Sequence, residues 1–369
     1  MIDLEELGAW IRLLETPGVG RESARRLLAA FGSPQAVLAA STAARREVVG
    51  TVAATALAES SEALDRQTRI TLDWLAAETT TPRSVVPLGH PLFPAALLHA
   101  ADPPLMLYAQ GRLELLGFEA IAVVGSRNPT RQGTDNARAF SAHLSQAGFT
   151  VISGLALGID AAAHEGGLEG AASTVAVVGT GLDRVYPKRH LALARRIAEH
   201  GLIVSEYSLG TPPLPENFPN RNRIIAGLSR GTLVVEAALR SGSLITARLA
   251  SESGRDVFAI PGSIHSPQSR GCHALIKQGA KLVENAQDVL EELNLPGTGS
   301  KTEAAQGELI LEQEDAVLQA LGFDPVTLDA LVARTDWSAA ALSVRLLELE
   351  LNGQVARLPG QLFQRIGAA

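Results

Sequence analysis

The feature that most constrains the fold is an alternation, between residues 120 and 283, of short apolar segments with segments of helical pattern. Strand-like apolar runs occur at 120–124, 150–152, 174–178, 202–204, 232–235, 257–260 and 281–283, and most are separated by helical segments such as 131–147, 159–169, 190–199 and 244–252. Continuous apolar strands joined by helices are typical of a parallel sheet covered on both faces. The sequence therefore predicts an α/β fold with a doubly wound parallel sheet, whose ligands bind at the carboxyl ends of the strands.

The composition is that of a folded protein with two or three domains. The chain has 369 residues, of which 46% are hydrophobic, and Cys272 is its single cysteine. One thiol cannot form an internal disulfide, which suits a reducing cytosol. The first residues lack the pattern of a signal peptide, and no run of about 20 apolar residues occurs. We therefore expect a cytoplasmic protein that does not enter a membrane.

Helical patterns also fill residues 3–78, with a tight turn at 16–20. This turn looks like that of a helix-hairpin-helix, in which the hairpin amides face a DNA phosphate. It is flanked by four arginines, Arg12, Arg21, Arg25 and Arg26. Because the segment is net acidic, the alternative is a small helical domain that keeps only the shape of the motif.

The last part of the chain has the pattern of a winged helix. Three helical segments near 310–321, 325–333 and 337–350 precede two short strands around 354–357 and 362–365. The third helix carries Arg345 beside Glu348 and Glu350, which favours a protein contact over DNA reading. We expect four segments in all, with a helical domain at 1–80, the α/β domain at 81–294, a Gly/Pro/Ser/Thr-rich linker at 295–308 and the winged helix at 309–369.

Charge is distributed unevenly along the chain, whose net charge is −7. Residues 1–119 hold 10 basic and 14 acidic side chains, residues 120–284 hold 17 and 12, and residues 285–369 hold 5 and 13. A basic middle between acidic ends indicates an anionic partner for the middle segment.

Three turns rich in small residues each follow a predicted strand, at 125–130, 153–160 and 178–183. In the first, Gly125 lets the backbone approach an anion, Ser126 offers a hydroxyl and Arg127 offers a guanidinium that can bind a phosphate through two hydrogen bonds. The second contains Gly154 and leads into a helix. Because all three turns lie at one edge of the sheet, they predict a concave site for phosphate.

Common cofactors and metals do not fit these turns. A dinucleotide-binding strand turn needs three glycines and a following acid, and none of the three turns has this pattern. No Walker lysine motif occurs, and the eight histidines lack metal-ligand spacing. Ser229 lies in a hydrolase-like Gly-x-Ser-x-Gly pattern, but the strand follows this pattern instead of preceding it. His164, one turn beyond Asp160, is expected to form a structural hydrogen bond with it. We therefore expect neither a cofactor nor a metal.

A further segment, Phe218–Ser229, places an aromatic ring beside Arg221 and Arg223 before an apolar helix. Arginine on phosphate, an aromatic face under a base and amides at base edges are the means by which proteins hold single-stranded nucleic acid. The alternative is that these arginines pair with protein acids such as Glu206 and Glu236.

Taken in order, these segments resemble the DprA/Smf family, the DNA-processing proteins of bacterial transformation. The resemblance covers about residues 85–285 and is carried by VVGSR, SGLALGIDAAAH, VAVVGTGLDRVYP, GLIVSEY, FPNRNRIIAGLS, VVEAALRSGSLITA, GRDVFAIPGSI and RGCHALIKQGA. It implies an extended Rossmann-like fold, flanked by a SAM-like helical domain and a winged helix. It also implies a homodimer that binds and protects single-stranded DNA and loads the recombinase RecA during natural transformation.

The resemblance also implies site residues. The family's phosphate pocket corresponds here to Ser126, Arg127 and Gly154, while Lys188 and the stretch with Phe218, Arg221 and Arg223 correspond to its mouth. No catalysis is implied. The alternative is an enzyme on the same fold, a nucleotide phosphoribohydrolase of the lysine-decarboxylase-like family. That family carries a PGGxGTxxE signature, whereas this chain has SRGTLVVEAALRSGS, which lacks the PGG and displaces the acid.

Overall fold

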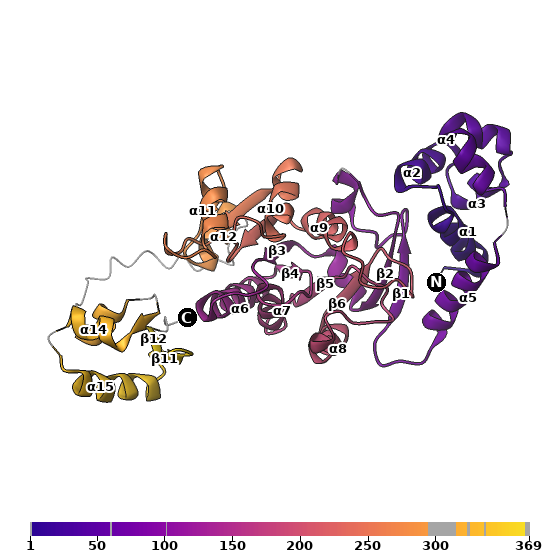
Figure 1. Ribbon diagram of the computed structural model, residues 1–369. Coiled ribbons are helices and arrows are strands. Elements are labelled where there is room, and N and C mark those ends of the chain that lie inside the picture. Colours follow the sequence, from indigo (N-terminus) through magenta and orange to yellow (C-terminus); the bar gives the residue numbers. More distant parts are fainter. Residues whose placement is uncertain are drawn as a thin grey trace. The chain divides into compact units, whose positions relative to one another are not determined.

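The computed structural model describes residues 2–59, 61–100, 102–293, 315–322, 325–335 and 337–365. The chain forms two compact units, Met1–Leu295 and Pro296–Ala369 (Figure 1). The predicted linker at 295–308 lies outside the described residues, as do the first residues of the helix expected near 310. Among the described helices, none has the length and apolar character needed to cross a membrane.

A nine-stranded sheet forms the centre of the first unit, in the order β1-β2-β6-β5-β4-β3-β7-β8-β9. Seven of its strands run parallel to one another, namely β3 (Ala120–Val124), β4 (Thr150–Ser153), β5 (Thr174–Val177), β6 (Leu202–Ser205), β7 (Gly231–Val234), β8 (Asp256–Ala259) and β9 (Lys281–Leu282). The prediction of a mostly parallel α/β sheet is confirmed. Two antiparallel strands that we did not assign to the sheet, β1 (Arg83–Pro87) and β2 (Met106–Gly111), extend its edge beside β6. Antiparallel edge strands are common additions to parallel sheets.

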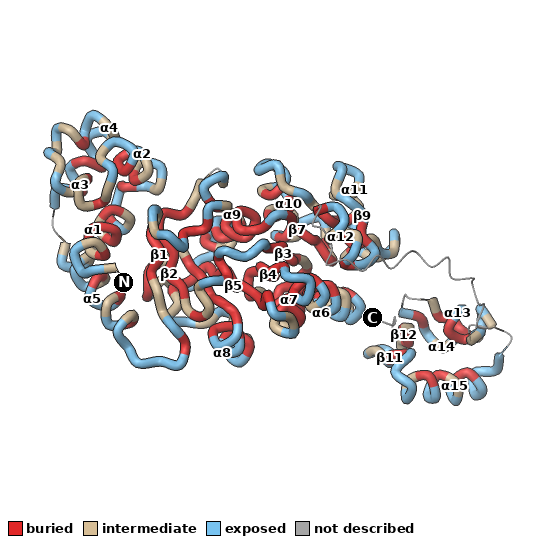
Figure 2. Tube along the Cα trace, turned by 180° about the vertical axis from the view of Figure 1, so that it is seen from behind, coloured by how far each residue is buried: buried red, intermediate tan, exposed pale blue. Residues whose placement is uncertain are grey.

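Helices cover both faces of this sheet, as expected for a doubly wound fold. The apolar residues alternate along each strand, so that Ala122 and Val124 face one core and Ile121 and Val123 face the other. The central strands are buried along their length (Figure 2). One face packs against α9 (Asn217–Leu228), α10 (Ser243–Glu252) and α11 (Arg270–Lys277), and the other against α6 (Arg131–Gln146), α7 (Ile159–Gly167), α8 (Leu191–His200) and α12 (Ala286–Glu292). Three short 3-10 helices complete the described part of the α/β region, η1 (Ala95–His99), η2 (Leu113–Gly117) and η3 (Lys188–His190).

Five helices precede the sheet, α1 (Leu4–Glu15), α2 (Arg21–Phe31), α3 (Pro34–Ala39), α4 (Thr42–Ala56) and α5 (Glu62–Ala76). Their apolar faces share one core with the edge of the sheet, where Trp10 and Trp74 belong to the same cluster as Tyr108 of β2. The Trp74 and Tyr108 rings meet edge to face, 6.2 Å apart. The boundary predicted at residue 80 therefore lies between segments that share apolar contacts.

The second unit has the winged-helix arrangement that the sequence predicted. Its elements are α13 (Ala316–Leu321), β10 (Val326–Thr327), α14 (Leu328–Arg334), α15 (Ala339–Leu351), β11 (Val355–Leu358) and β12 (Leu362–Arg365), and the strands pair antiparallel in the order β10-β12-β11. In α15, Arg345 contacts Asp315 and Glu348. The solvent face of α15 carries apolar side chains at Val344, Leu347 and Leu351. This helix therefore does not have the basic solvent face of a DNA-reading helix.

Candidate nucleic-acid interface

An open pocket of about 490 Å³ lies where β3 and β7 end. Three segments far apart in the sequence line it: the turn after β3, the first residues of α9 and the loop 238–243 before α10. Four of the seven site residues predicted from the sequence lie in its wall, namely Ser126, Arg127, Phe218 and Arg221. Of the three predicted turns, the first lines the pocket, the second contributes Ala156 and Asp160, and residues 178–183 of the third do not line it.

The turn after β3 is held closely against its neighbours. A Cβ on Gly125 would lie 2.6 Å from the Ile159 side chain and 2.9 Å from the Glu236 carbonyl oxygen, so only glycine fits there. The Ser126 hydroxyl oxygen accepts a hydrogen bond from the Asn128 N–H (3.1 Å), which leaves its O–H able to donate to a ligand. Arg127 extends from this turn and is exposed.

Glu236, at the end of the β7 region, fixes the start of α6. Its carboxylate accepts hydrogen bonds from the N–H and the hydroxyl of Thr130 (2.9 and 2.5 Å). Thr130 in turn caps α6 by accepting the Gly133 N–H at 2.9 Å. Glu236, the acid of the stretch compared with the phosphoribohydrolase signature, is thus bound to the residue that caps α6.

Two buried charged side chains, Arg221 of α9 and Asp160, bind the backbone of the second turn. Arg221 is 5% exposed and donates to the Gly154 carbonyl oxygen at 2.8 Å, while Asp160 accepts the N–H groups of Gly154 and Ala156. Burial raises the pKa of the Asp160 carboxyl, and the nearby Arg221 opposes this. Burial likewise lowers the pKa of the Arg221 guanidinium. Among the described residues, the Arg221 Nε–H has no hydrogen-bond acceptor.

The structure explains why a glycine is present at position 154, one of the predicted site residues. A Cβ at this position would lie 1.5 Å from Nη1 of Arg221, so the glycine makes room for the guanidinium. Gly154 therefore does not line the pocket itself, and its role is to leave space for Arg221, which does.

The predicted hydrogen bond between the described side chains of His164 and Asp160 does not form. His164 instead accepts the Leu155 N–H at Nε2 (3.3 Å), and its Nδ1 lies 2.7 Å from the Thr174 hydroxyl, which donates to the Val151 carbonyl. These partners require a neutral ring protonated on Nδ1. Burial lowers the pKa of His164 to about 3. Both side chains still have structural roles, because each holds the 154–156 turn separately.

An exposed row of planar groups leads away from the pocket. The Arg127 guanidinium lies 6.0 Å from the Phe218 ring centre, and the Phe218 ring lies 5.5 Å from the Tyr186 ring. Tyr186 is 48% exposed. Such a row offers successive faces on which bases can stack. We did not predict Tyr186 as a site residue, although its position beside Lys188 in the sequence was a usable signal.

Lys188 begins η3 and is exposed, two residues beyond Tyr186, but it does not line the pocket. Arg240 and Gln268, which sequence reasoning missed, do line it. Arg240 follows β7 in a loop that the sequence marks only by small residues. Neither Arg127 nor Arg240 forms an ion pair with a carboxylate of the described residues, so both charges are available to an anion.

The segment with Phe218 is helical, and not a loop before a helix as predicted. Helix α9 already begins at Asn217, so Phe218 and Pro219 lie in its first turn. Proline is tolerated there because the first N–H groups of a helix have no partner within the helix. Asn217 anchors this turn by donating to the Gly179 carbonyl oxygen at 3.0 Å.

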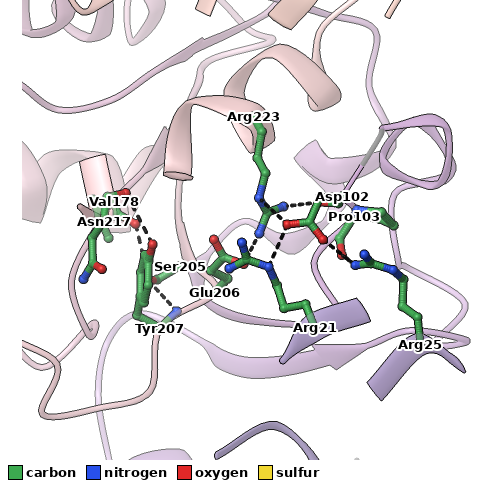
Figure 3. Close-up of polar contacts among 10 residues, drawn as sticks. All are labelled: Arg21, Arg25, Asp102, Pro103, Val178, Ser205, Glu206, Tyr207, Asn217 and Arg223. Carbon is green, nitrogen blue, oxygen red and sulfur yellow. Dashed lines mark hydrogen bonds and ion pairs between the residues drawn. The ribbon is translucent and has the colours of Figure 1, made fainter. Parts of the chain in front are cut away.

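Arg223 lies apart from the pocket. Its guanidinium contacts the Glu206 carboxylate and donates to the Asp102 carbonyl oxygen, as Figure 3 shows. Arg223 therefore pairs with a protein acid, Glu206, which was the alternative to its binding nucleic acid. The second acid of that alternative, Glu236, is bound to Thr130 instead.

The arginines beside the N-terminal hairpin also contact protein. Arg12 donates to the carbonyl oxygens of Leu57 and Glu59 (3.0 and 3.1 Å). Arg21 and Arg25 both bind the Asp102 carboxylate, at 2.7 and 2.5 Å. These contacts, made by three of the four arginines, favour the alternative of a helical domain that keeps only the shape of the motif. Within the described residues, no group of His, Cys, Asp and Glu is arranged to hold a metal ion.

The fold and the pocket together define a doubly wound α/β protein with an arginine-lined pocket, an N-terminal helical layer and a winged helix. Comparison with known proteins is more specific. The family described as DNA recombination-mediator protein A matches residues 84–294, and the DprA winged helix domain matches residues 301–361. The chain belongs to the DprA/Smf family of DNA-processing proteins.

Individual relatives agree with this assignment. Protein Smf of Escherichia coli is 43% identical over 284 residues, which cover 75% of this chain and 76% of the relative. DNA processing protein DprA of Streptococcus pneumoniae is 50% identical over 200 residues, 54% of this chain and 71% of the relative. The X-ray structure of the S. pneumoniae protein superposes with a TM-score of 0.69 at 37% identity, covering 80% of this chain and 99% of that one.

A second solved structure is informative about ligands. DNA processing protein A of Helicobacter pylori superposes with a TM-score of 0.52 at 31% identity, covering 57% of this chain and 95% of that one. It is described by its unique single-stranded DNA binding mode.

Proposed function

We propose that this protein binds single-stranded DNA in the pocket at the end of β3 and acts as a recombination mediator. In this role a homodimer in the bacterial cytoplasm protects incoming DNA and loads the RecA recombinase during natural transformation. Membership of the DprA/Smf family and the single-stranded DNA binding of the H. pylori relative support the proposal. The function is one of binding, without catalysis.

The observation that carries the proposal is the combination of charge and aromatic surface at one sheet edge. Arg127, Arg221 and Arg240 line a pocket of about 490 Å³, and the Phe218 ring stands at its wall with Tyr186 beyond it. Arginines can hold successive phosphates, while unpaired bases stack on the rings. A duplex cannot use this surface in the same way, because its bases are already stacked on one another.

The test is a comparison of single- and double-stranded oligonucleotides of equal length, titrated by fluorescence anisotropy at several salt concentrations. We expect tighter binding of the single strand with little dependence on sequence. The logarithm of the binding constant should fall with the logarithm of the salt concentration by about 0.7 per phosphate contact. Tighter binding of duplex, or an affinity that salt does not change, would refute the proposal.

The recombinase step needs a separate experiment. The ATPase activity of RecA on single-stranded DNA coated with single-strand-binding protein reports how fast RecA assembles there. We expect this protein to shorten the lag of that activity, and light scattering after gel filtration should give the mass of a dimer. An unchanged lag would refute RecA loading while leaving DNA binding in place.

A further inference from the structure

A cluster of five charged side chains joins the N-terminal helices to the α/β region (Figure 3). We call it the charge cluster, and it consists of Arg21, Arg25, Asp102, Glu206 and Arg223. Arg21 and Arg25 come from α2, Asp102 from the connector before β2, Glu206 from the end of β6 and Arg223 from α9. Ion pairs in this cluster therefore connect four separate segments of the chain.

Asp102 is the centre of this cluster. One of its carboxylate oxygens accepts Nε of Arg21 at 2.7 Å and lies 3.4 Å from Nε of Arg223, and the other accepts Nη1 of Arg25 at 2.5 Å. The neighbouring arginines hold the pKa of this carboxyl below its usual value, against the opposing effect of its burial. Asp102 is therefore ionised at neutral pH and links α2 directly to α9.

Glu206 and Arg223 form the buried part of the cluster. Their side chains are 6% and 11% exposed, whereas those of Arg21 and Asp102 are 37% and 31% exposed. Arg21 also lies 3.6 Å from Glu206. Removing one member of a buried pair leaves the other charge without compensation, so the structure around it must shift or hydrate.

Helix α9 connects this cluster to the DNA pocket. Arg223 follows Arg221 by two positions on the same helix, and Phe218 lies in its first turn. The residue after Glu206, Tyr207, donates its hydroxyl to the Asn217 carbonyl oxygen at 3.3 Å, at the first residue of α9. A displacement of Arg223 or Glu206 therefore moves the helix that carries the pocket residues.

We propose that Arg21, Arg25 and Asp102 are positioning residues for single-stranded DNA binding. They fix α9 through Arg223 and Glu206, and so hold Phe218 and Arg221 in the pocket wall without touching DNA. This inference rests on the proposed function. It gives the N-terminal hairpin a role that differs from the phosphate binding of a helix-hairpin-helix.

The sign of one substitution separates positioning from simple electrostatics. Asp102→Asn removes a negative charge from a protein that binds a polyanion, so the overall field of the protein then favours DNA more strongly. Positioning predicts the opposite, because the amide no longer holds the arginines of α2 and α9 together. We expect Asp102→Asn to weaken binding by about three- to tenfold, and Glu119→Gln, which alters an exposed acid paired with Arg230, to leave affinity equal or slightly higher.

Salt dependence gives a second measure. Arg21→Gln should weaken binding by a similar factor without changing the slope of affinity against salt concentration. Arg127→Ala, by contrast, should make the fall of affinity with salt less steep, by about 0.7 in the slope, since a phosphate contact is lost. Arg21→Lys keeps the charge and one bond to Asp102 and should recover part of the affinity. Affinity is measured on protein shown to be folded by thermal melting, so that loss of stability is not mistaken for loss of positioning.

The outcomes are distinguishable. Affinity that stays constant or rises in Asp102→Asn, while Arg127→Ala still weakens binding, overturns the positioning role and leaves the proposed function standing. A salt slope that falls in Arg21→Gln means that the hairpin arginine contacts DNA itself, and this also overturns it. If Asp102→Asn does not fold, Arg21→Gln and Arg21→Lys decide the matter by the same measurements. Failure of the wild-type protein to prefer single strands overturns both proposals.

Discussion

Replacing Gly154 by alanine isolates what the buried Arg221 side chain contributes. The new Cβ would lie 1.5 Å from Nη1, 2.2 Å from Cζ and 2.4 Å from Nη2 of Arg221, so the guanidinium must leave its place. The φ angle of Gly154 is outside the left-handed region, and alanine therefore adds no backbone strain of its own. The substitution acts through this one steric conflict.

The magnitude follows from what the displaced guanidinium loses. Its hydrogen bond to the Gly154 carbonyl oxygen contributes roughly 1.5–3 kcal/mol, as bonds to charged groups do. The displaced guanidinium also moves away from the buried Asp160 carboxylate, whose ionised form its charge favours. We therefore expect the free energy of unfolding to fall by about 1.5–3 kcal/mol.

The assay is urea unfolding of the full chain followed by tryptophan fluorescence, with DNA affinity measured on the folded variant. Gly117→Ala is the matched control, because Gly117 is exposed and a Cβ there meets no atom within 4 Å. In an Arg221→Ala background, Gly154→Ala should cost little, since the clashing group is gone. Wild-type stability and affinity in Gly154→Ala, or full additivity with Arg221→Ala, would show that this reasoning is wrong.

Four further predictions follow from the site and the two units. Arg127→Ala should weaken single-strand binding about 10–100-fold in anisotropy titrations, because a charge-assisted contact is worth roughly 1.5–3 kcal/mol, whereas Arg345→Ala should not, because Arg345 is paired within the winged helix. His164, with its pKa lowered to about 3, takes up its proton in the unfolded state first, so stability should fall as pH drops below about 6.5, by about 2 kcal/mol at pH 5; His164→Gln should abolish this share of the pH dependence in urea titrations. Cys272 is buried and its pKa is raised to about 12, so a thiol reagent should modify it only after unfolding. Removal of residues 296–369 should leave most single-strand binding intact, because this segment holds 5 basic and 10 acidic side chains.

Each of these has a contrary result. Equal affinity of the Arg127 and Arg345 variants for DNA would show that the pocket with Arg127 is not the DNA-binding site. An unchanged pH profile in His164→Gln would assign the acid sensitivity to other groups, and rapid modification of Cys272 in native protein would contradict its burial. A tenfold or greater loss of binding on truncation, with the circular dichroism of an intact core, would mean that the winged helix binds DNA.

The sequence by itself determined the parallel part of the sheet, but not its two antiparallel edge strands. Apolar runs of three to five residues, separated by helical segments, can be buried only if helices cover both faces, and the seven predicted runs became the parallel strands. It also indicated the edge of the sheet, because turns at the carboxyl ends of parallel strands meet there, but it missed the loop 238–243 that lines the pocket. The winged helix followed from local patterns of the same kind.

Only the tertiary structure decided which charged residues serve the pocket. Arg221 and Arg223 are equivalent in the sequence, but α9 is helical through both, and residues two positions apart in a helix point about 200° away from each other. One therefore reaches Gly154 at the pocket wall and the other reaches Glu206 and Asp102. The partners of Arg21 and Arg25 likewise depend on a contact between segments about 80 residues apart, and no local pattern specifies which acid such an arginine will meet.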